Sequence, residues 1–265
     1  MQKILVTGAC GQIGSELTLF LAKEFGQQNV IASDIKKATS PLLSGIPFIY
    51  LDVLDAAAVN KLVVENDIDT IFHMAAILSA VGEQNPQLAY QVNMYGLINV
   101  LEAARTHKVE RILVPSSIAA FGQDAPKDNT PDETLMNPTT MYGVTKVAGE
   151  KLSQYYFIKY GVDVRSVRYP GIISSETLPG GGTTDFAVDI YIKAIQNIPY
   201  ECYIDENTVL PFMHMPDAIK AIVELAKPEN SALTRRVYNI HALSLTPAQI
   251  VESVRKYYPD FQITY

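Results

Sequence analysis

Short runs of apolar, often β-branched residues alternate with longer helical patterns through the first two thirds of this chain. The predicted strands span residues 3–7, 30–33, 47–51, 70–73, 111–115 and 163–168, and the predicted helices span residues 12–25, 56–65, 86–107 and 141–160. Strand, helix and strand in succession are typical of parallel sheets, because the helix carries the chain back across one face. Right-handed crossovers of this kind predict an α/β fold with a doubly wound parallel sheet, of the Rossmann type.

The alternation stops after Tyr169, and a smaller part with a mixed pattern follows. A glycine- and threonine-rich segment at 180–184 precedes predicted helices at 185–196, 215–226 and 246–257 and a predicted strand at 237–240. We expect a dinucleotide-binding domain over residues 1–169, with return segments near 205–217 and 236–241, and a mainly substrate-binding part over residues 170–265. Residues 261–265 resemble a strand that begins and is cut off, as in a chain truncated at its C-terminus.

Composition and charge exclude several classes of protein. The 265 residues are 48% hydrophobic, which is enough for a large buried core. A net charge of -7 leaves no basic stripe for a phosphate backbone, so no nucleic-acid partner is expected. No segment approaches the roughly 20 apolar residues of a membrane span, and no targeting signal precedes the first strand, so a cytoplasmic protein is expected. Cys10 and Cys202 are expected to be reduced thiols without metal-ligand spacing.

Three glycines at a spacing of three follow the first predicted strand and open the first predicted helix. In such a loop Gly8 makes the tight turn, Gly11 lets the backbone approach a pyrophosphate, and Gly14 lets the helix pack closely on the strand. The first helical residues, Gln12 and Ile13, then present N–H groups toward the phosphates. The loop predicts a dinucleotide-binding site.

Asp34 ends the second predicted strand, 20 residues after Gly14. At this position a carboxylate accepts hydrogen bonds from the adenosine ribose, and its charge repels a 2′-phosphate, so NAD is expected rather than NADP. Ile35 is expected beside the adenosine as well. Lys36 and Lys37 leave NADP open as an alternative, because a displaced loop would bring them to such a phosphate.

Two residues after the third predicted strand, Asp52 and Val53, are placed to meet the adenine. For Asp52 a different role is nearly as good, because an aspartate shortly before the predicted helix 56–65 is a suitable N-cap. The sequence alone leaves both readings open.

Tyr142 and Lys146 are four residues apart and therefore lie on one face of a predicted helix. The ammonium is expected to lower the pKa of the phenol, so that Tyr142 takes the hydroxyl proton of an alcohol while hydride leaves its carbon. Ser117, 25 residues earlier at the carboxyl end of the fifth strand, is expected to orient the substrate hydroxyl. Taken singly, each of these residues has an ordinary structural alternative.

Together these residues resemble the extended short-chain dehydrogenase/reductase superfamily, which contains nucleotide-sugar epimerases and dehydratases. The resemblance also includes His73-Met74-Ala75-Ala76, Val92-Asn93 and Arg168-Tyr169-Pro170-Gly171. It implies that the nicotinamide is flanked by residues from two segments, Ala75, Ala76, Tyr169, Pro170 and Ile172. His73 and Asn93 have a structural hydrogen-bonding role as their alternative.

Within that superfamily, residues 77–83, 115–122 and 178–188 are similar to the short-chain type of L-threonine 3-dehydrogenase. This resemblance implies that Ser79, Gly182 and Thr184, with Ser117 and Tyr142, contact an amino-acid substrate. One departure is that these enzymes usually continue to a C-terminal tryptophan near the substrate, whereas this chain has no tryptophan.

The charge between residues 170 and 213 favours a small zwitterion over a nucleotide sugar. Lys193 is the only cation there, against six acids. Enzymes of nucleotide sugars hold the diphosphate with arginine, and where related epimerases carry that arginine this chain has Leu210. A zwitterion's carboxylate can instead be held by serine and threonine hydroxyls and a glycine backbone concavity.

The sequence therefore predicts metal-free, NAD-dependent oxidation of the L-threonine 3-hydroxyl to 2-amino-3-oxobutyrate. The alternatives are a nucleotide-sugar 4-epimerase or dehydratase and a non-catalytic NAD-sensing protein. Predicted helices 86–107 and 141–160 resemble the pair that forms a four-helix interface in this superfamily, which implies a homodimer. Functional coupling to a 2-amino-3-oxobutyrate CoA ligase is the other expected partnership.

Overall fold

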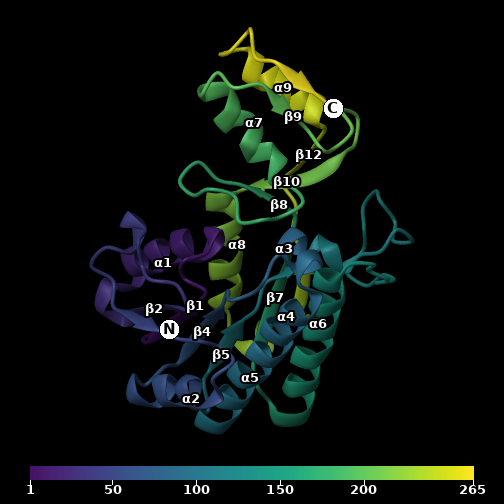
Figure 1. The fold of residues 1–265 in the computed structure, drawn as a ribbon. Helices are drawn as coiled ribbons and strands as arrows, with labels where there is room; N and C mark the ends of the chain where they lie inside the picture. Colours follow the sequence, from purple (N-terminus) through teal and green to yellow (C-terminus); the bar gives the residue numbers. More distant parts are fainter.

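The computed structural model describes residues 1–265 and contains one large central sheet (Figure 1). Its strands lie in the order β11 (Val237–Asn239), β7 (Val164–Tyr169), β5 (Arg111–Leu113), β4 (Thr70–His73), β1 (Ile4–Thr7), β2 (Val30–Asp34) and β3 (Phe48–Tyr50), and β6 (Ser116–Ser117) adds to β7. Every pairing in this sheet is parallel. The predicted Rossmann-type doubly wound sheet is confirmed.

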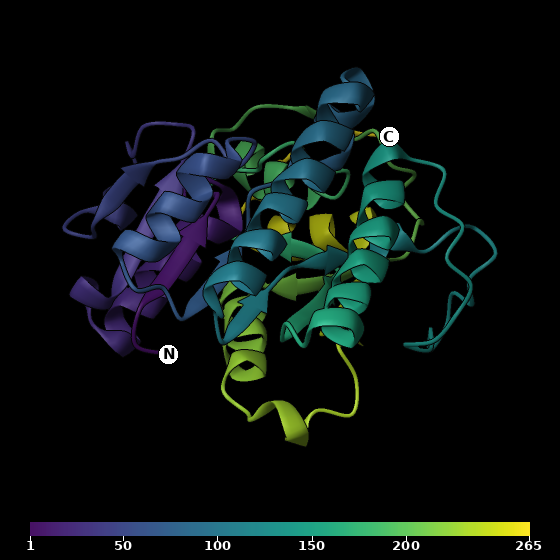
Figure 2. The same cartoon turned by 90° about the horizontal axis from the view of Figure 1, so that it is seen from below.

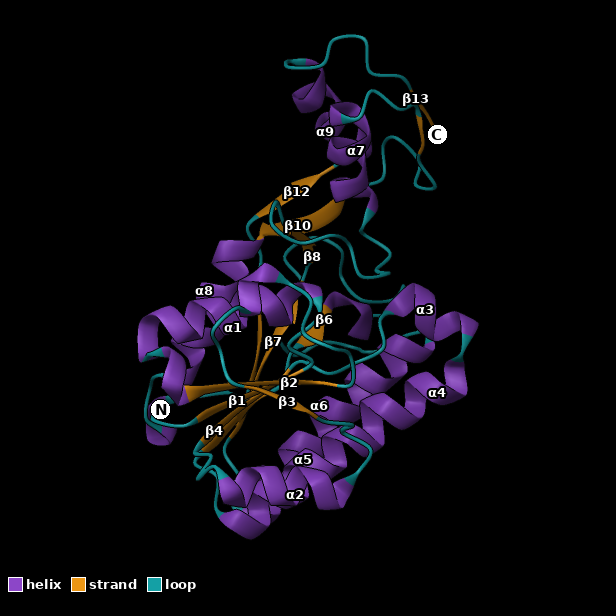
Figure 3. Cartoon of the chain, turned by 60° about the vertical axis from the view of Figure 1, so that its left-hand side comes forward, coloured by secondary structure: helices purple, strands orange, loops and turns teal.

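Helices cover both faces of the central sheet (Figure 3). One face carries α1 (Gln12–Phe25) and α8 (Met215–Ala226), and the other carries α2 (Ala56–Glu65), α5 (Gly96–His107) and α6 (Met141–Tyr160). The central strand β1 shows why the sheet is buried on both sides: Ile4 and Val6 pack with α1 and α8, whereas Leu5 packs with α2 and α5. Alternate side chains of one strand thus enter two separate cores.

The predicted helix 86–107 is divided in the structure. It consists of α4 (Pro86–Tyr90), a π-helical turn η3 (Gln91–Tyr95) and α5, and α3 (Ser79–Gln84) precedes it as a separate short helix. The widened turn carries Asn93, whose side chain bonds both backbone polar groups of Ile77. Helix α6 lies beside α4 and α5 (Figure 2).

The predicted strand 111–115 is also divided, into β5 and β6. Pro115 lies at the break and has no backbone N–H to give to a neighbouring strand. Short 3₁₀ turns occur elsewhere in the chain, at η1 (Gln27–Asn29), η2 (Pro41–Leu43), η4 (Ile118–Ala120) and η5 (Asn230–Ala232).

A smaller part lies beyond the carboxyl ends of the central strands (Figures 1 and 3). It contains a three-stranded sheet of β12 (Leu243–Leu245), β10 (Leu210–His214) and β8 (Gly171–Ile173), a two-stranded sheet of β9 (Tyr200–Glu201) and β13 (Ile263–Thr264), and helices α7 (Phe186–Ile195) and α9 (Pro247–Arg255). Its core of ten buried residues includes Phe186, Phe212 and Ile250.

After leaving the central sheet at β7, the chain returns to it twice, through α8 and through β11. Residues 210–214 belong to the small sheet instead. The division at residue 169 stays a prediction. No helix has the length and apolar character needed to cross a bilayer.

Candidate active site

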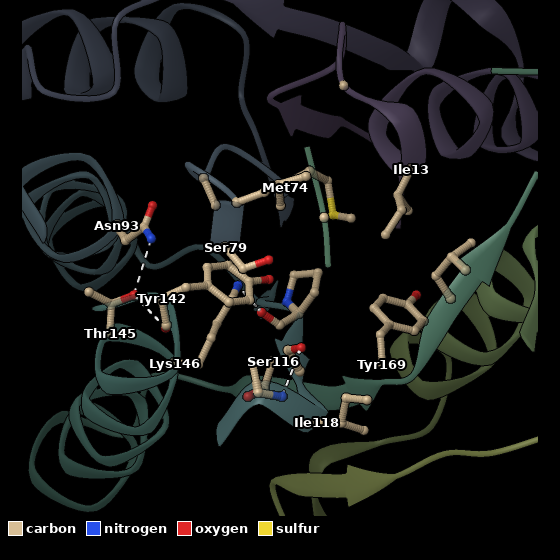
Figure 4. A pocket seen from close by; sticks show the side chains of 18 of the residues that line it. Ile13, Met74, Ser79, Asn93, Ser116, Ile118, Tyr142, Thr145, Lys146 and Tyr169 are labelled. Carbon is tan, nitrogen blue, oxygen red and sulfur yellow. Dashed lines mark hydrogen bonds between the residues drawn. The ribbon is translucent and has the colours of Figure 1, made fainter. Parts of the chain in front are cut away.

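A cavity of about 510 Å³ lies between the central sheet and the smaller part. Its walls are the glycine loop, the carboxyl ends of β4, β6 and β7, the first turns of α6, and the segment 182–185 (Figure 4). The volume is that of a small-molecule site, at the sheet edge where open α/β folds bind ligands.

The glycine loop is built so tightly that side chains would not fit at two of its positions. Gly8 has φ +69°, and a Cβ there would lie 2.5 Å from the backbone N of Ala75. A Cβ at Gly14 would lie 2.1 Å from the carbonyl oxygen of Gly8. At Gly11 the nearest atom would be 3.2 Å away, and no other lies within 4 Å, because this residue borders the cavity. The loop therefore has the shape that its spacing predicts.

The donors at the start of α1 fit the diphosphate of a dinucleotide. No side chain caps this helix, and Gln12 Nε2 is buried without a hydrogen-bond partner. Gln12 and Ile13 both line the cavity. Uncapped N–H groups and a buried amide donor call for an anionic acceptor, because buried donors without a partner are rare and costly.

The predicted adenosine contacts lie at the edge of this site rather than on its cavity wall. Asp34 is tied to the glycine loop, since its Oδ2 accepts a hydrogen bond from the Cys10 N–H at 2.9 Å. Ile35 is half exposed, and Val53 packs against Gly96. The carboxylate of Asp34 thus provides one negative charge beside the glycine loop, as expected of a ribose acceptor.

The helix-capping alternative for Asp52 is wrong. Asp55 is the N-cap of α2, and its side chain accepts a hydrogen bond from the Ala58 N–H at 2.9 Å. Asp52 instead accepts from the Leu54 N–H within its own turn. Its predicted contact with the adenine stays a prediction.

The predicted nicotinamide contacts Ala75, Ala76, Tyr169, Pro170 and Ile172 all line the cavity. Tyr169 can offer the nicotinamide its ring (Figure 4) but not its hydroxyl. The hydroxyl donates a hydrogen bond to the Ala218 carbonyl at 2.7 Å.

The two buried polar residues with a structural alternative do have structural partners. His73 is paired with the Thr7 hydroxyl at 2.8 Å, and burial lowers its pKa to about 3, so it stays neutral. Asn93 joins Ile77 to the hydroxyl of Thr145 on α6.

Tyr142 and Lys146 lie one turn apart on α6 and both face the cavity (Figure 4). Thr140 caps this helix by accepting a hydrogen bond from the Gly143 N–H. Lys146 Nζ donates to the Pro115 carbonyl at 2.7 Å and lies 5.2 Å from the centroid of the Tyr142 ring. Ser117 follows at the end of β6, so the structure brings all three predicted catalytic residues to one cavity.

The titration of these groups corrects one expectation. Burial raises the pKa of Tyr142 to about 12, and only the Ser117 hydroxyl opposes that rise. Burial also lowers the pKa of Lys146 to about 8, which Glu150 opposes. The expectation of a lowered phenol pKa is wrong for the protein alone, because loss of solvation disfavours the phenolate and only the Ser117 hydroxyl opposes this effect.

Sequence reasoning missed the ion pair beneath Lys146. Glu150, one turn further along α6, accepts hydrogen bonds from Arg168 Nη2 at 2.7 Å and from Ser116 Oγ at 2.5 Å. Glu150 and Arg168 are both buried. The signal was available, because residues 142, 146 and 150 form one stripe on the helix.

The segment that carries Gly182 and Thr184 is held against α3 by sequence-distant contacts. Ser79 Oγ accepts from the Thr183 N–H at 3.2 Å, and the Ala80 N–H donates to the Gly181 carbonyl at 3.1 Å. Ser79, Gly182 and Thr184 all line the cavity, and their contact with a substrate stays a prediction.

The expected backbone concavity at these glycines is already filled. Asp185 Oδ2 accepts from the N–H groups of Gly181 and Gly182 at 2.8 and 2.7 Å. A substrate carboxylate therefore does not find these donors free, and that part of the expectation is wrong.

Comparison with known proteins gives the class to which this fold and site belong. Residues 4–240 match the NAD dependent epimerase/dehydratase family, so the chain belongs to it and uses NAD as its cofactor. The chain is an enzyme of the NAD-dependent oxidoreductase or epimerase type.

Individual relatives are similar to this chain over nearly its whole length. An uncharacterized epimerase/dehydratase of Staphylococcus aureus is 50% identical over 268 residues, covering 100% of this chain and 83% of the relative. The solved L-threonine dehydrogenase of Clostridium difficile is 51% identical, covers 100% of this chain and 83% of that one, and has a TM-score of 0.94. A monomeric L-threonine 3-dehydrogenase from a metagenome is 43% identical, with 99% and 84% coverage and a TM-score of 0.94.

Proposed function

We propose that this enzyme oxidises the 3-hydroxyl of L-threonine to 2-amino-3-oxobutyrate with NAD. The observation that carries the proposal is the charge of the cavity wall: Lys146 is its only lysine, no arginine lines it, and its one histidine, His73, stays neutral. A nucleotide sugar would bring a second diphosphate with no cation to bind it. The similarity to L-threonine dehydrogenases supports the same substrate.

The three predicted catalytic residues have distinct roles in this proposal. Ser117 Oγ orients the substrate hydroxyl, and Tyr142 takes its proton. NAD, when bound, supplies the acceptor for the hydride. Because burial raises the pKa of Tyr142, the phenol becomes a base only when positive charge in the cavity offsets that rise. Lys146, one turn away, is the residue of this chain that supplies such charge while it stays protonated.

The remaining assignments follow from position. NAD is held by Gly8, Gly11, Gln12, Ile13, Gly14, Asp34, Ile35, Asp52, Val53, Ala75, Ala76, Tyr142, Lys146, Tyr169, Pro170 and Ile172, and the substrate by Ser79, Ser117, Tyr142, Gly182 and Thr184. The boundary of the NAD-binding domain at residue 169 belongs to this proposal. A cytoplasmic location, a role in threonine catabolism and coupling to a CoA ligase stay predictions.

A substrate panel tests the proposal. The enzyme and NAD are mixed separately with L-threonine, L-allo-threonine, D-threonine, L-serine and UDP-sugars, and the absorbance of reduced nicotinamide is followed. We expect the largest rate with L-threonine. A 4-epimerase regenerates its coenzyme, so sugar products are measured in the same reactions. Turnover of UDP-sugars alone contradicts the proposal.

Substitution of the base separates an enzyme from a protein that only senses NAD. In Tyr142→Phe we expect turnover to fall about 10³-fold, because a positioned proton acceptor contributes roughly 10²–10⁴-fold. NAD affinity, measured by calorimetry, is expected to stay within about threefold. The matched control is Tyr156→Phe on the same helix, whose hydroxyl bonds Glu102 away from the cavity. Equal activity of wild type and Tyr142→Phe contradicts the assigned role.

A homodimer through α4 to α6 is part of the proposal. These helices lie side by side and expose large apolar side chains, namely Leu88, Tyr90, Tyr95, Val144 and Tyr155. Such a face is typical of a protein interface. Sedimentation at micromolar concentration is expected to show two chains, and monomer alone contradicts this prediction.

A further inference from the structure

Two carboxylates line the cavity, and only one of them has a cationic partner. Glu150 is paired with Arg168 at 2.7 Å beneath the catalytic residues. Asp185 lines the opposite wall and forms no ion pair. Burial raises the pKa of Asp185, as expected of a carboxylate that has lost water without gaining a cation.

The two oxygens of Asp185 are in different situations. Oδ2 accepts both backbone N–H groups of Gly181 and Gly182, whereas Oδ1 accepts no hydrogen bond. Oδ1 lies beside Gly182, only 2.9 Å from where a Cβ on that glycine would be. The loop therefore fixes the carboxylate through one oxygen and leaves the other without a hydrogen-bond partner.

The surroundings of Asp185 add further negative charge. Asp189 follows one turn along α7, and the charge of Asp185 contributes to the raised pKa of that residue. Lys193, another turn on, is the only cation between residues 170 and 213. This wall of the cavity therefore favours a positively charged group on the ligand.

We propose that Asp185 Oδ1 accepts the ammonium group of an amino-acid substrate and so determines specificity for 2-amino-3-hydroxy acids over 3-hydroxy acids. The inference rests on the proposed function and extends it to the end of the substrate opposite the reacting hydroxyl. Ser79 on α3 is bonded to the loop that carries Asp185, so a hydroxyl for the substrate carboxylate lies next to the carboxylate for the ammonium.

Asp185→Asn tests this inference with little change in shape. The amide oxygen can keep both loop hydrogen bonds, while the amide NH₂ replaces the oxygen that faces the ammonium. We measure kcat/KM for L-threonine and for 3-hydroxybutyrate of the same hydroxyl configuration, which lacks only the ammonium. Binding of L-2-aminobutyrate and butyrate to the enzyme with NAD is measured by calorimetry in parallel. Asp189→Asn is the matched control, because it removes a neighbouring charge that does not line the cavity.

For Asp185→Asn we expect kcat/KM for L-threonine to fall about 10- to 100-fold, the range for a hydrogen bond to a charged group. The value for 3-hydroxybutyrate and the affinity for butyrate are expected to stay unchanged or to rise. Asp189→Asn is expected to change each value less than threefold. Equal losses with both substrates, or no loss with either, overturn the inference.

The binding arm separates this inference from the proposed function. If the wild type oxidises no amino acid, the proposed function fails. Binding of L-2-aminobutyrate and butyrate, which do not react, then still tests whether Asp185 accepts an ammonium group. A preference for L-2-aminobutyrate over butyrate that disappears in Asp185→Asn supports the inference, and the absence of such a preference in the wild type overturns it.

Discussion

The two walls of the cavity are built in different ways. On the NAD side, backbone atoms of neighbouring elements touch each other, as where Gly14 closes on the carbonyl of Gly8. On the substrate side, a few hydrogen bonds hold the loop before α7 to a segment about a hundred residues away in the sequence. The bond from the Thr183 N–H to the Ser79 hydroxyl is one of them. The first wall is therefore rigid, and the second depends on contacts that can exchange.

The hydrophobic core beneath the NAD wall is also larger than the core beneath the substrate wall. The NAD side rests on two clusters of 21 and 19 buried residues, one on each face of the central sheet. The smaller part has a cluster of 10 buried residues. Since local opening is easier where fewer apolar contacts are lost, substrate-wall changes should alter substrate binding without unfolding the protein.

The largest effect on NAD binding is expected from Gly14→Ala, which inserts a methyl group 2.1 Å from the Gly8 carbonyl oxygen. The first turn of α1 must move away from β1, so we expect NAD affinity to fall about 100-fold through loss of phosphate hydrogen bonds. Overpacking of this kind should also cost about 1–3 kcal/mol of folding free energy. Calorimetry with NAD and urea unfolding measure the two effects.

Gly161→Ala is the matched control for this prediction. Its Cβ would meet nothing within 4 Å, but its φ of +72° is in the left-handed region. We expect a loss of about 1 kcal/mol in stability and no change in NAD affinity. If Gly14→Ala binds NAD as tightly as this control does, the close contact between Gly14 and Gly8 does not determine NAD affinity.

The NAD wall could be predicted from sequence because local geometry determines it. Gly8, Gly11 and Gly14 lie at a fixed spacing between one strand and one helix, and parallel strands place Asp34 beside them. The stripe of Tyr142 and Lys146 follows in the same way from the helical repeat. Such patterns need no knowledge of distant contacts.

The substrate wall and the titration of the site could not be predicted in this way. That Asp185 occupies the glycine donors depends on the fold of a loop, and the direction of the Tyr142 pKa depends on burial. The π-helical turn at Asn93 likewise follows from a partner at Ile77. Each of these features is set by three-dimensional neighbours that spacing does not reveal.

Glu150→Gln tests the catalytic residues, which lie between the two walls. Lys146 loses its proton as pH rises through its pKa of about 8. The negative charge of Glu150 raises that pKa. Without this charge the pKa falls further, so we expect the alkaline limb of the kcat/KM profile to move to lower pH. Breaking the buried pair with Arg168 should also cost about 3 kcal/mol. The pH profile and urea unfolding measure these effects.

Asp163→Asn separates the charge effect from the loss of a buried pair. Asp163 bonds Arg165 at 2.6 Å, and both residues are buried away from the cavity. We expect a similar loss of stability with an unchanged alkaline limb. A limb that moves equally in both variants would attribute the shift to destabilisation rather than to Lys146.

The smallest effect is expected from Gly182→Ala, the counterpart of Gly14→Ala on the other wall. The new methyl group lies 2.9 Å from Asp185 Oδ1, which is the end of a side chain and can swing aside, whereas the Gly8 carbonyl cannot. We expect stability to change by less than about 0.5 kcal/mol and NAD affinity to stay constant. KM for L-threonine should rise about three- to tenfold, because the displaced carboxylate no longer meets the ammonium. A loss of stability or NAD affinity as large as that of Gly14→Ala would show that the two walls are equally rigid, and the contrast between them would fail.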